Sequence, residues 1–257
     1  MILHSFGASG DGFTPIASLV FDKKGNLYGT TSDGGAYGCG AVFELTPSGI
    51  ETILHSFGAS GDGEYPYGSL VFDKMGNLYG TTSDGGAYGT RCGGTGCGTV
   101  FELTPSGTET ILHSFGASGD GFTPFASLVF DKMGNLYGTT YQGGAYDYGT
   151  VFELTPEGTE KVLYSFGGNG DGAYPTSGLV LGKKRVLYGT TSGGNYGYGT
   201  VFEVTLSGSE KILWGFQDIP DGCIPFGGLA LDKNGNLYGT TYYGGAYGYG
   251  TVFRVTP

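Results

Sequence analysis

One aspartate recurs at the same place in five similar stretches of the chain. It opens an Asp-Gly-x-x-Pro element, and the five copies are Asp11, Asp62, Asp120, Asp171 and Asp221. Carboxylates repeated in this way could accept hydrogen bonds from sugar hydroxyls or help to hold a hard cation such as Ca²⁺. A short acidic side chain in a turn also accepts hydrogen bonds from its own loop backbone, which would make the series structural. Both roles stay open, and the sequence implies no cofactor other than this calcium ion.

Tyrosines recur with the same period in a glycine-rich segment. Their equivalent positions are Tyr37, Tyr88, Tyr146, Tyr196 and Tyr247, and a second tyrosine follows two residues later at Tyr148, Tyr198 and Tyr249. An aromatic ring can stack on the face of a sugar while its hydroxyl forms hydrogen bonds. The same ring packs well between neighbouring strands, because tyrosine combines an apolar body with a polar tip. Ligand binding and packing are therefore both open for this series.

The histidines and one series of glutamates are expected to be structural. His4, His55 and His113 occupy one equivalent position, where later copies have Tyr164 and Trp214. Because they lie on different repeats, they are too far apart to share one metal ion. The glutamates are Glu44, Glu102, Glu153 and Glu203. One carboxylate per repeat does not give the convergent pair of a glycosidase, so cross-strand pairing is expected for them.

The four cysteines allow two disulfide pairings. Cys92 and Cys97 bracket part of an insertion and could form a local disulfide, as in proteins of oxidising compartments. Cys39 is the equivalent of Cys97 one repeat earlier, so Cys39–Cys92 is the rival pairing. Cys223 has no obvious partner, and the spacing is not that of a zinc site.

No catalytic motif is present, and no catalytic residue is predicted. The chain lacks a nucleophile elbow, a zinc-protease motif, a phosphate-binding loop and a dinucleotide fingerprint. A single active site also requires one special set of residues, whereas the copies here are nearly identical.

These residues are positioned by five tandem repeats. The phrase Gly-Asn-Leu-Tyr-Gly-Thr-Thr opens at Gly25, Gly76, Gly134 and Gly235, and a variant of it begins at Arg185. The repeats span 2–52, 53–110, 111–161, 162–211 and 212–257. Each contains four short segments rich in Val, Leu, Phe, Tyr and Thr, and in the first repeat these are Ile2–Phe6, Ser18–Asp22, Asn26–Thr31 and Ala41–Thr46. Four strands in a repeat of this length are typical of a β-propeller blade.

The order of the strands predicts how the ring closes. We label them A (Ser18–Asp22), B (Asn26–Thr31), C (Ala41–Thr46) and D (Ile53–Phe57). Residues Ile2–Phe6 are then a strand D without a blade, and the C-terminal repeat lacks one. We therefore expect one all-β domain over 1–257: a five-bladed propeller of four-stranded blades, closed by the N-terminal strand on the C-terminal blade. The long D–A and B–C loops should share one acidic, tyrosine-rich face, where binding commonly resides.

Composition excludes several partners. The net charge is −11, which disfavours nucleic acid and anionic membranes, because both are bound by clustered Lys and Arg. No apolar run is long enough to span a bilayer. The N-terminus enters a repeat at once, without a signal segment.

The pattern Leu-Tyr-Gly-Thr-Thr, Gly-Gly-Ala-Tyr-Gly, Gly-Thr-Val-Phe-Glu-Leu-Thr resembles the GloVer tandem repeat of bacterial proteins over essentially the whole chain. The resemblance implies an exported or surface-attached protein, often with a separate anchoring tail. It implies no particular chemistry.

Together these features predict a monomeric, non-catalytic extracellular binding module, with several similar sites for glycans on the face of the long loops. The alternatives are a structural or adhesion repeat that binds a surface protein and, less favoured, a hydrolase or cyclase in the central channel.

Overall fold

The computed structural model describes residues 1–89, 92–167, 170–194, 197–217 and 219–257. Regular structure in these ranges consists of β-strands and one short 3₁₀ turn, η1 (Lys183–Arg185), with no α-helix. The described ranges accordingly contain no helix that is long and apolar enough to cross a membrane.

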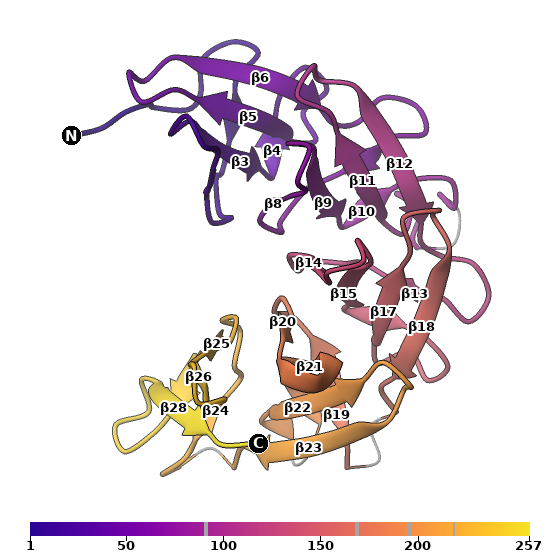
Figure 1. The fold of residues 1–257 in the computed structure, drawn as a ribbon, viewed down its shortest axis with the longest axis vertical. Helices are drawn as coiled ribbons and strands as arrows, with labels where there is room; N and C mark the ends of the chain where they lie inside the picture. The colour runs from indigo at the N-terminus through magenta and orange to yellow at the C-terminus, as the bar shows by residue number, and fades with distance from the viewer. Residues whose placement is uncertain (90–91, 168–169, 195–196, 218) are drawn as a thin grey trace. The chain divides into compact units, whose positions relative to one another are not determined.

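Antiparallel sheets account for most of the regular structure (Figure 1). The first contains β2 (Val20–Phe21), β3 (Leu27–Thr31), β5 (Ala41–Leu45) and β6 (Glu51–Ser56). The second contains β8 (Val71–Phe72), β9 (Leu78–Thr82), β11 (Thr99–Leu103) and β12 (Glu109–Ser114). The third contains β14 (Val129–Phe130), β15 (Leu136–Thr140), β17 (Thr150–Leu154) and β18 (Glu160–Ser165). The fourth contains β20 (Val180–Leu181), β21 (Val186–Gly194), β22 (Thr200–Thr205) and β23 (Glu210–Gly215). The last has three strands, β25 (Ala230–Leu231), β26 (Leu237–Thr241) and β28 (Thr251–Val255).

Short two-stranded ladders join the two long loops of each repeat. They pair β1 (Gly12–Phe13) with β4 (Asp33–Gly34), β7 (Gly63–Glu64) with β10 (Asp84–Gly85), β13 (Gly121–Phe122) with β16 (Gln142–Gly143), and β24 (Gly222–Cys223) with β27 (Tyr243–Gly244). In the fourth repeat β19 (Gly172–Pro175) pairs with the end of β21. The D–A loop and the B–C loop of a repeat therefore lie together, as the strand order predicts.

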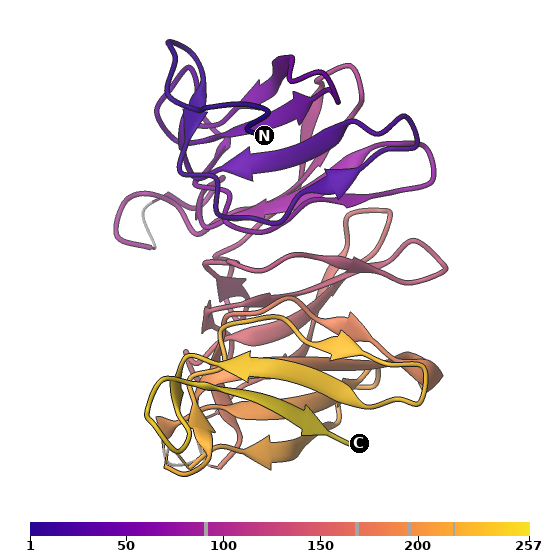
Figure 2. The ribbon, with the colours of Figure 1, turned by 90° about the vertical axis from the view of Figure 1, so that its left-hand side faces the viewer.

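The chain forms two compact units. Unit 1 contains residues 1–117 and 123–128, and unit 2 contains 118–122 and 129–257. The first two sheets belong to unit 1 and the others to unit 2. Figure 2 views the same strands from the side, with connecting loops at both ends of the strands of each unit.

The first, second, fourth and last sheets pack closely over a glycine in the strand at position B, namely Gly29, Gly80, Gly189 and Gly239. A Cβ on Gly80 would lie 2.6 Å from Cζ of Phe101 and 3.0 Å from Cδ2 of Leu70, so the Phe ring and the Leu side chain close directly over the backbone. Phe101 and Leu70 are fully buried together with Phe57. This contact explains the Gly of Leu-Tyr-Gly-Thr-Thr, because any larger residue would push the two side chains apart.

The order A, B, C, D is confirmed in the four-stranded sheets, although the strands are shorter at A and begin two residues earlier at D. The first strand D, for example, is Glu51–Ser56 instead of the expected Ile53–Phe57. No strand forms at Ile2–Phe6, because a strand requires a hydrogen-bonded partner and unit 1 provides none for this segment. Ring closure stays a prediction.

Candidate functional site

The repeated aspartates are built into their own loops. Asp11 is buried, its Oδ1 accepts a hydrogen bond from the backbone N–H of Gly12 (2.7 Å), and its Oδ2 accepts one from Gly7 (2.9 Å). Burial by itself would raise the pKa of Asp11, but these hydrogen bonds hold the pKa below its ordinary value. Both bonds recur at Asp62, the bond to Oδ1 recurs at Asp120, and the bond to Oδ2 recurs at Asp171. The carboxylates thus have the loop-ordering geometry that the sequence offered as the structural alternative.

A side chain seven residues earlier also reaches four of the five repeated carboxylates. His4 Nε2 lies 3.2 Å from Asp11 Oδ2, and His55 Nε2 lies 3.0 Å from Asp62 Oδ2. In unit 2 the hydroxyl of Tyr164 donates to Asp171 (2.7 Å), and Trp214 Nε1 donates to Asp221 (3.0 Å). His, Tyr and Trp share a ring with an N–H or O–H donor, which explains why these three residue types exchange at this position. His113, the third histidine, belongs to unit 1, whereas Asp120 belongs to unit 2.

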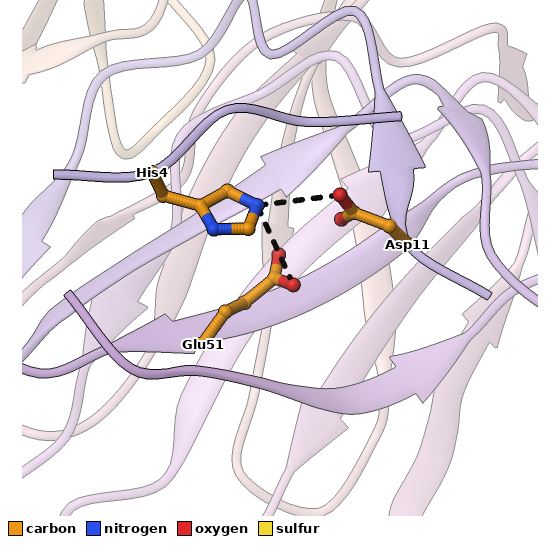
Figure 3. A group of neighbouring side chains, drawn as sticks. All are labelled: His4, Asp11 and Glu51. Atoms are coloured by element: carbon orange, nitrogen blue, oxygen red, sulfur yellow. Dashed lines mark hydrogen bonds and ion pairs between the residues drawn. The ribbon is translucent and has the colours of Figure 1, made fainter. Parts of the chain in front are cut away.

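A second glutamate series, which the sequence analysis missed, approaches these pairs. Glu51 is the first residue of β6, and its Oε2 lies 3.6 Å from His4 Nε2. Figure 3 shows the carboxylates of Asp11 and Glu51 both directed toward this ring nitrogen. Glu109, the first residue of β12, completes the equivalent group with His55 and Asp62. The sequence contains a pattern that could have identified this series. Each of the four strands that begin with one of these glutamates has His, Tyr or Trp four residues after the Glu.

The surroundings of these glutamates raise the pKa of their carboxyl groups. Burial, and next the hydrogen bond with Asp11 and the charge of Asp11, raise the pKa of Glu51. Burial and the charge of Asp62 raise the pKa of Glu109 to about 7. In unit 2, burial and the charge of Asp171 raise the pKa of Glu210 to about 7. Each of these glutamates also has a buried Oε1 without a hydrogen-bond partner.

The loop tyrosines lie at the surface. The exposed fraction is 60% for Tyr37, 42% for Tyr88, 62% for Tyr146 and 89% for Tyr247, while Tyr196 lies outside the described residues. Their bases are supported: a Cβ on Gly58 would lie 3.0 Å from Cβ of Tyr37, and one on Gly167 would lie 3.1 Å from the ring of Tyr146. The structure therefore separates the two predicted series, with aspartates inside the loops and tyrosine rings outside them.

Additional aromatic rings gather near the loops of unit 2. Tyr148 packs edge-on against Tyr174 with ring centroids 5.5 Å apart, and Tyr141 lies 5.1 Å from the same ring. In the last repeat Tyr242 and Tyr243 lie 4.4 Å apart, and both are exposed.

The cysteines adopt the local pairing. Cys92 and Cys97 form a disulfide, so the rival Cys39–Cys92 pairing does not occur. Cys97 is buried, and Cys223 is buried in unit 2. The disulfide closes residues 92–97 into a small ring within the B–C loop that carries Tyr88.

The glutamates of the middle strands pair across the sheet. Glu44 Oε1 accepts hydrogen bonds from Asn26 Nδ2 (2.7 Å) and from the hydroxyl of Tyr28 (3.0 Å). Burial and this hydrogen bond raise the pKa of Tyr28 to about 12. Glu102 and Glu153 form equivalent bonds.

One family model matches the sequence. It is described as the Gloeobacter/Verrucomicrobia repeat, and it matches residues 1–129 and 88–257, which together span the chain. No curated protein matches the sequence.

Several solved structures share the fold at low identity. XC5397 from Xanthomonas campestris, a gluconolactonase, is 15% identical with a TM-score of 0.55, over 93% of this chain and 71% of that chain. The extracellular domain of a candidate one-component system from B. thetaiotaomicron is 14% identical with a TM-score of 0.61, over 93% of this chain and 28% of that chain. PorZ, a surface component of the type-IX secretion system of Porphyromonas gingivalis, is 15% identical with a TM-score of 0.56, over 98% of this chain and 33% of that chain. These similarities support a propeller-like all-β fold and carry no activity.

Proposed function

The chain belongs to the Gloeobacter/Verrucomicrobia repeat family, and we propose that it is a non-catalytic, multivalent binding module for neutral glycans. The observation that carries this proposal is the exposure of a tyrosine ring at the same loop position in four described repeats. An exposed ring on a supported base offers a flat apolar platform, and its hydroxyl can bond to a sugar hydroxyl.

Several weak sites on one chain favour polymeric ligands. Binding at a second site becomes intramolecular once the first is occupied, so avidity exceeds the affinity of either site by about 10²–10⁴-fold. The loop aspartates contribute indirectly under this proposal, because their hydrogen bonds set the shape of the loops that carry the rings.

Charge selects among glycans. The net charge of −11 repels uronic-acid and sulfated polymers, whereas neutral polysaccharides carry no such penalty. The proposal is therefore limited to neutral sugars.

We extend the proposal to a closed five-bladed ring, which the burial pattern within each unit supports. Leu19 is 47% exposed, although its equivalents Leu70 and Leu179 are 1% and 6% exposed. In unit 2, Val252 is 81% exposed, although its equivalent Val201 is fully buried. The first and last sheets thus each expose an apolar position that the intervening sheets bury. Closure would cover both and remove the free edge of β28, in keeping with a monomer.

An extracellular or cell-surface location follows from the same proposal. The Cys92–Cys97 disulfide persists in oxidising compartments and is rare in the reducing cytosol.

Affinity electrophoresis in native gels tests the binding proposal. Gels containing a neutral β-glucan, arabinoxylan or galactomannan should retard the purified chain, and polygalacturonate should not. A variant carrying Tyr37→Ala, Tyr88→Ala, Tyr146→Ala and Tyr247→Ala should lose the retardation, whereas the matched Tyr→Phe variant should keep most of it because the rings remain.

Two results would overturn the proposal. One is full retardation of the Ala variant, which would show that the loop rings do not bind the sugar. The other is migration unaffected by every neutral polysaccharide, which would favour a protein ligand or a structural role.

A further inference from the structure

A β-bulge in strand β6 places two side chains that could bind a metal ion, Glu51 and His55, on opposite faces of the strand. Glu51 pairs with Leu45 of β5, and His55 pairs with Val42, so the five residues from Glu51 to His55 oppose only four residues of β5. The partners Leu45 and Val42 are three residues apart on β5, and residues three apart on a regular strand lie on opposite faces. The extra residue, Leu54, therefore turns His55 to the face opposite Glu51.

This reversal builds two equivalent clusters in unit 1. Cluster 1 combines Glu51 with His4 and Asp11, and cluster 2 combines His55 with Asp62 and with Glu109 of the next strand D. Without the bulge, Glu51 and His55 would share a face, and β6 could not contribute to both clusters.

The donor atoms have the spacing of metal ligands. Two ligand atoms that each lie about 2.1 Å from a tetrahedral zinc ion are separated by about 3.4 Å. His4 Nε2 lies 3.2 Å from Asp11 Oδ2 and 3.6 Å from Glu51 Oε2. In both clusters one donor atom from each of the three residues lies within 4.8 Å of the others. Small side-chain rotations would bring all three around one ion.

The rings and carboxylates are already oriented. His4 packs edge-on against Phe6 and His55 against Phe57, each with ring centroids 4.7 Å apart. Backbone N–H groups hold both oxygens of Asp11 and Asp62, the kind of outer support that ligating carboxylates have in metal sites.

A second observation indicates that the clusters need a cation. Glu51 Oε1 and Glu109 Oε1 are buried acceptors without a hydrogen-bond donor. Neither cluster has a Lys or Arg ion-pair partner among the described residues. Two carboxylates and one imidazole place more acidic than basic groups together at a largely buried site, where a bound cation would stabilise both carboxylates in their charged form.

We propose that cluster 1 and cluster 2 each bind one divalent transition-metal ion, with zinc as the best fit. One imidazole nitrogen with two carboxylate oxygens gives three protein ligands and leaves a position for water. The imidazole disfavours Ca²⁺ and Mg²⁺, which take oxygen ligands. The ion would join the N-terminal segment to β6 and β6 to β12, so its role is to fasten neighbouring repeats.

The chain contains its own negative control. In unit 2 the group Tyr164, Asp171 and Glu210 has the same plan, but a tyrosine hydroxyl replaces the imidazole. This group retains both carboxylates and lacks the ligand that favours zinc. His113, Asp120 and Glu160 repeat the ligand set in sequence, so the whole chain is expected to bind at least two equivalents.

The test is equilibrium dialysis of the full chain, stripped with EDTA, against Zn²⁺, followed by metal analysis. Glu109→Gln and His55→Phe should each lose one equivalent relative to the unmodified chain, and Glu210→Gln should lose none. Dialysis against Ca²⁺ should load none of these positions. In parallel, Co²⁺ should give a visible absorption spectrum whose intensity falls in the first two variants.

Circular dichroism of each stripped variant establishes that it is folded. If Glu109→Gln does not fold, the zinc content of the His55→Phe variant alone tests whether cluster 2 binds the metal. Unchanged zinc uptake in these variants would overturn the proposal, as would equal loss in Glu210→Gln. Absence of zinc uptake by the unmodified chain at micromolar concentrations would overturn it as well.

Discussion

Replacing Glu210 with Gln should change how the stability of the protein depends on pH. Glu210 begins β23, its Oε1 is buried without a partner, and burial and the charges of Asp171 and Glu203 raise its pKa from 4.5 to about 7. Tyr164, which donates to Asp171, and Lys211, which lies 3.7 Å from Glu203, are the other titratable groups around it.

The sign follows from proton binding. Between pH 4.5 and about 7, Glu210 is deprotonated in the unfolded chain but keeps its proton in the folded one. The unfolded state therefore binds fewer protons, and the free energy of unfolding falls as pH rises through this window. Below pH 4.5 both states are protonated and no penalty remains.

The size of the effect can be worked out from the same pKa. A rise from 4.5 to about 7 corresponds to about 3.4 kcal/mol. Because Glu210 is partly exposed to solvent, screening reduces this to about 1–2 kcal/mol. Glu210→Gln removes the titration, so its stability relative to the unmodified chain should improve by about 1–2 kcal/mol between pH 5 and pH 8.

Urea denaturation followed by the fluorescence of Trp214, the only tryptophan, measures this difference at the two pH values. The exposed Glu157→Gln variant controls for the loss of one negative charge. An equal stability difference at pH 5 and pH 8, or one that shrinks with rising pH, would refute the reasoning.

Two further predictions concern the packing and the ring. Gly80→Ala should lower the free energy of unfolding by about 1–3 kcal/mol, measured by urea denaturation, because its Cβ would overlap Phe101. Ser5→Cys combined with Thr251→Cys should form a disulfide on oxidation, seen as a mobility shift on non-reducing gels, if Ile2–Phe6 pairs with β28 in the register of the other repeats. Directly opposed residues lie about 4.5–5.5 Å apart, within the span of a disulfide.

Each of these has its own control. Ala41→Cys with Ser56→Cys provides the positive control for cross-linking, because these two residues are paired in the structure. Both cross-linking experiments use chains in which Cys39 and Cys223 are replaced by Ser. A Ser5–Thr251 pair that stays reduced, or links only between molecules, would contradict closure. An Ala at position 80 without effect on stability would contradict the packing of Phe101 on this strand.

The sheets were predictable because their signals are local. Alternating β-branched and aromatic residues, with compact turns such as Asp22–Asn26, define strands B and C, and the order of the strands follows from the repeat itself. The shortness of strand A was not predictable, since its Leu-Val-Phe run is apolar on both faces and only two of its residues pair.

The loops and the clusters depended on contacts that a pattern does not show. Two-residue ladders such as Gly12–Phe13 with Asp33–Gly34 contain glycine and aspartate, which disfavour strands, so only tertiary pairing creates them. Glu51 was not recognised as part of a site, because its partners His4 and Asp11 lie forty or more residues away and the bulge at Leu54 has no sequence signal. The tyrosine series was identified from its spacing, while its exposure required the structure.

The central claim, that the loop tyrosines form a multivalent site for neutral glycans, is tested most directly by a printed array of neutral and anionic oligosaccharides probed with the purified chain. The account predicts reproducible binding to a structurally related set of neutral glycans, lost in the Tyr37→Ala, Tyr88→Ala, Tyr146→Ala, Tyr247→Ala variant. A blank array, or binding confined to anionic glycans, would contradict it.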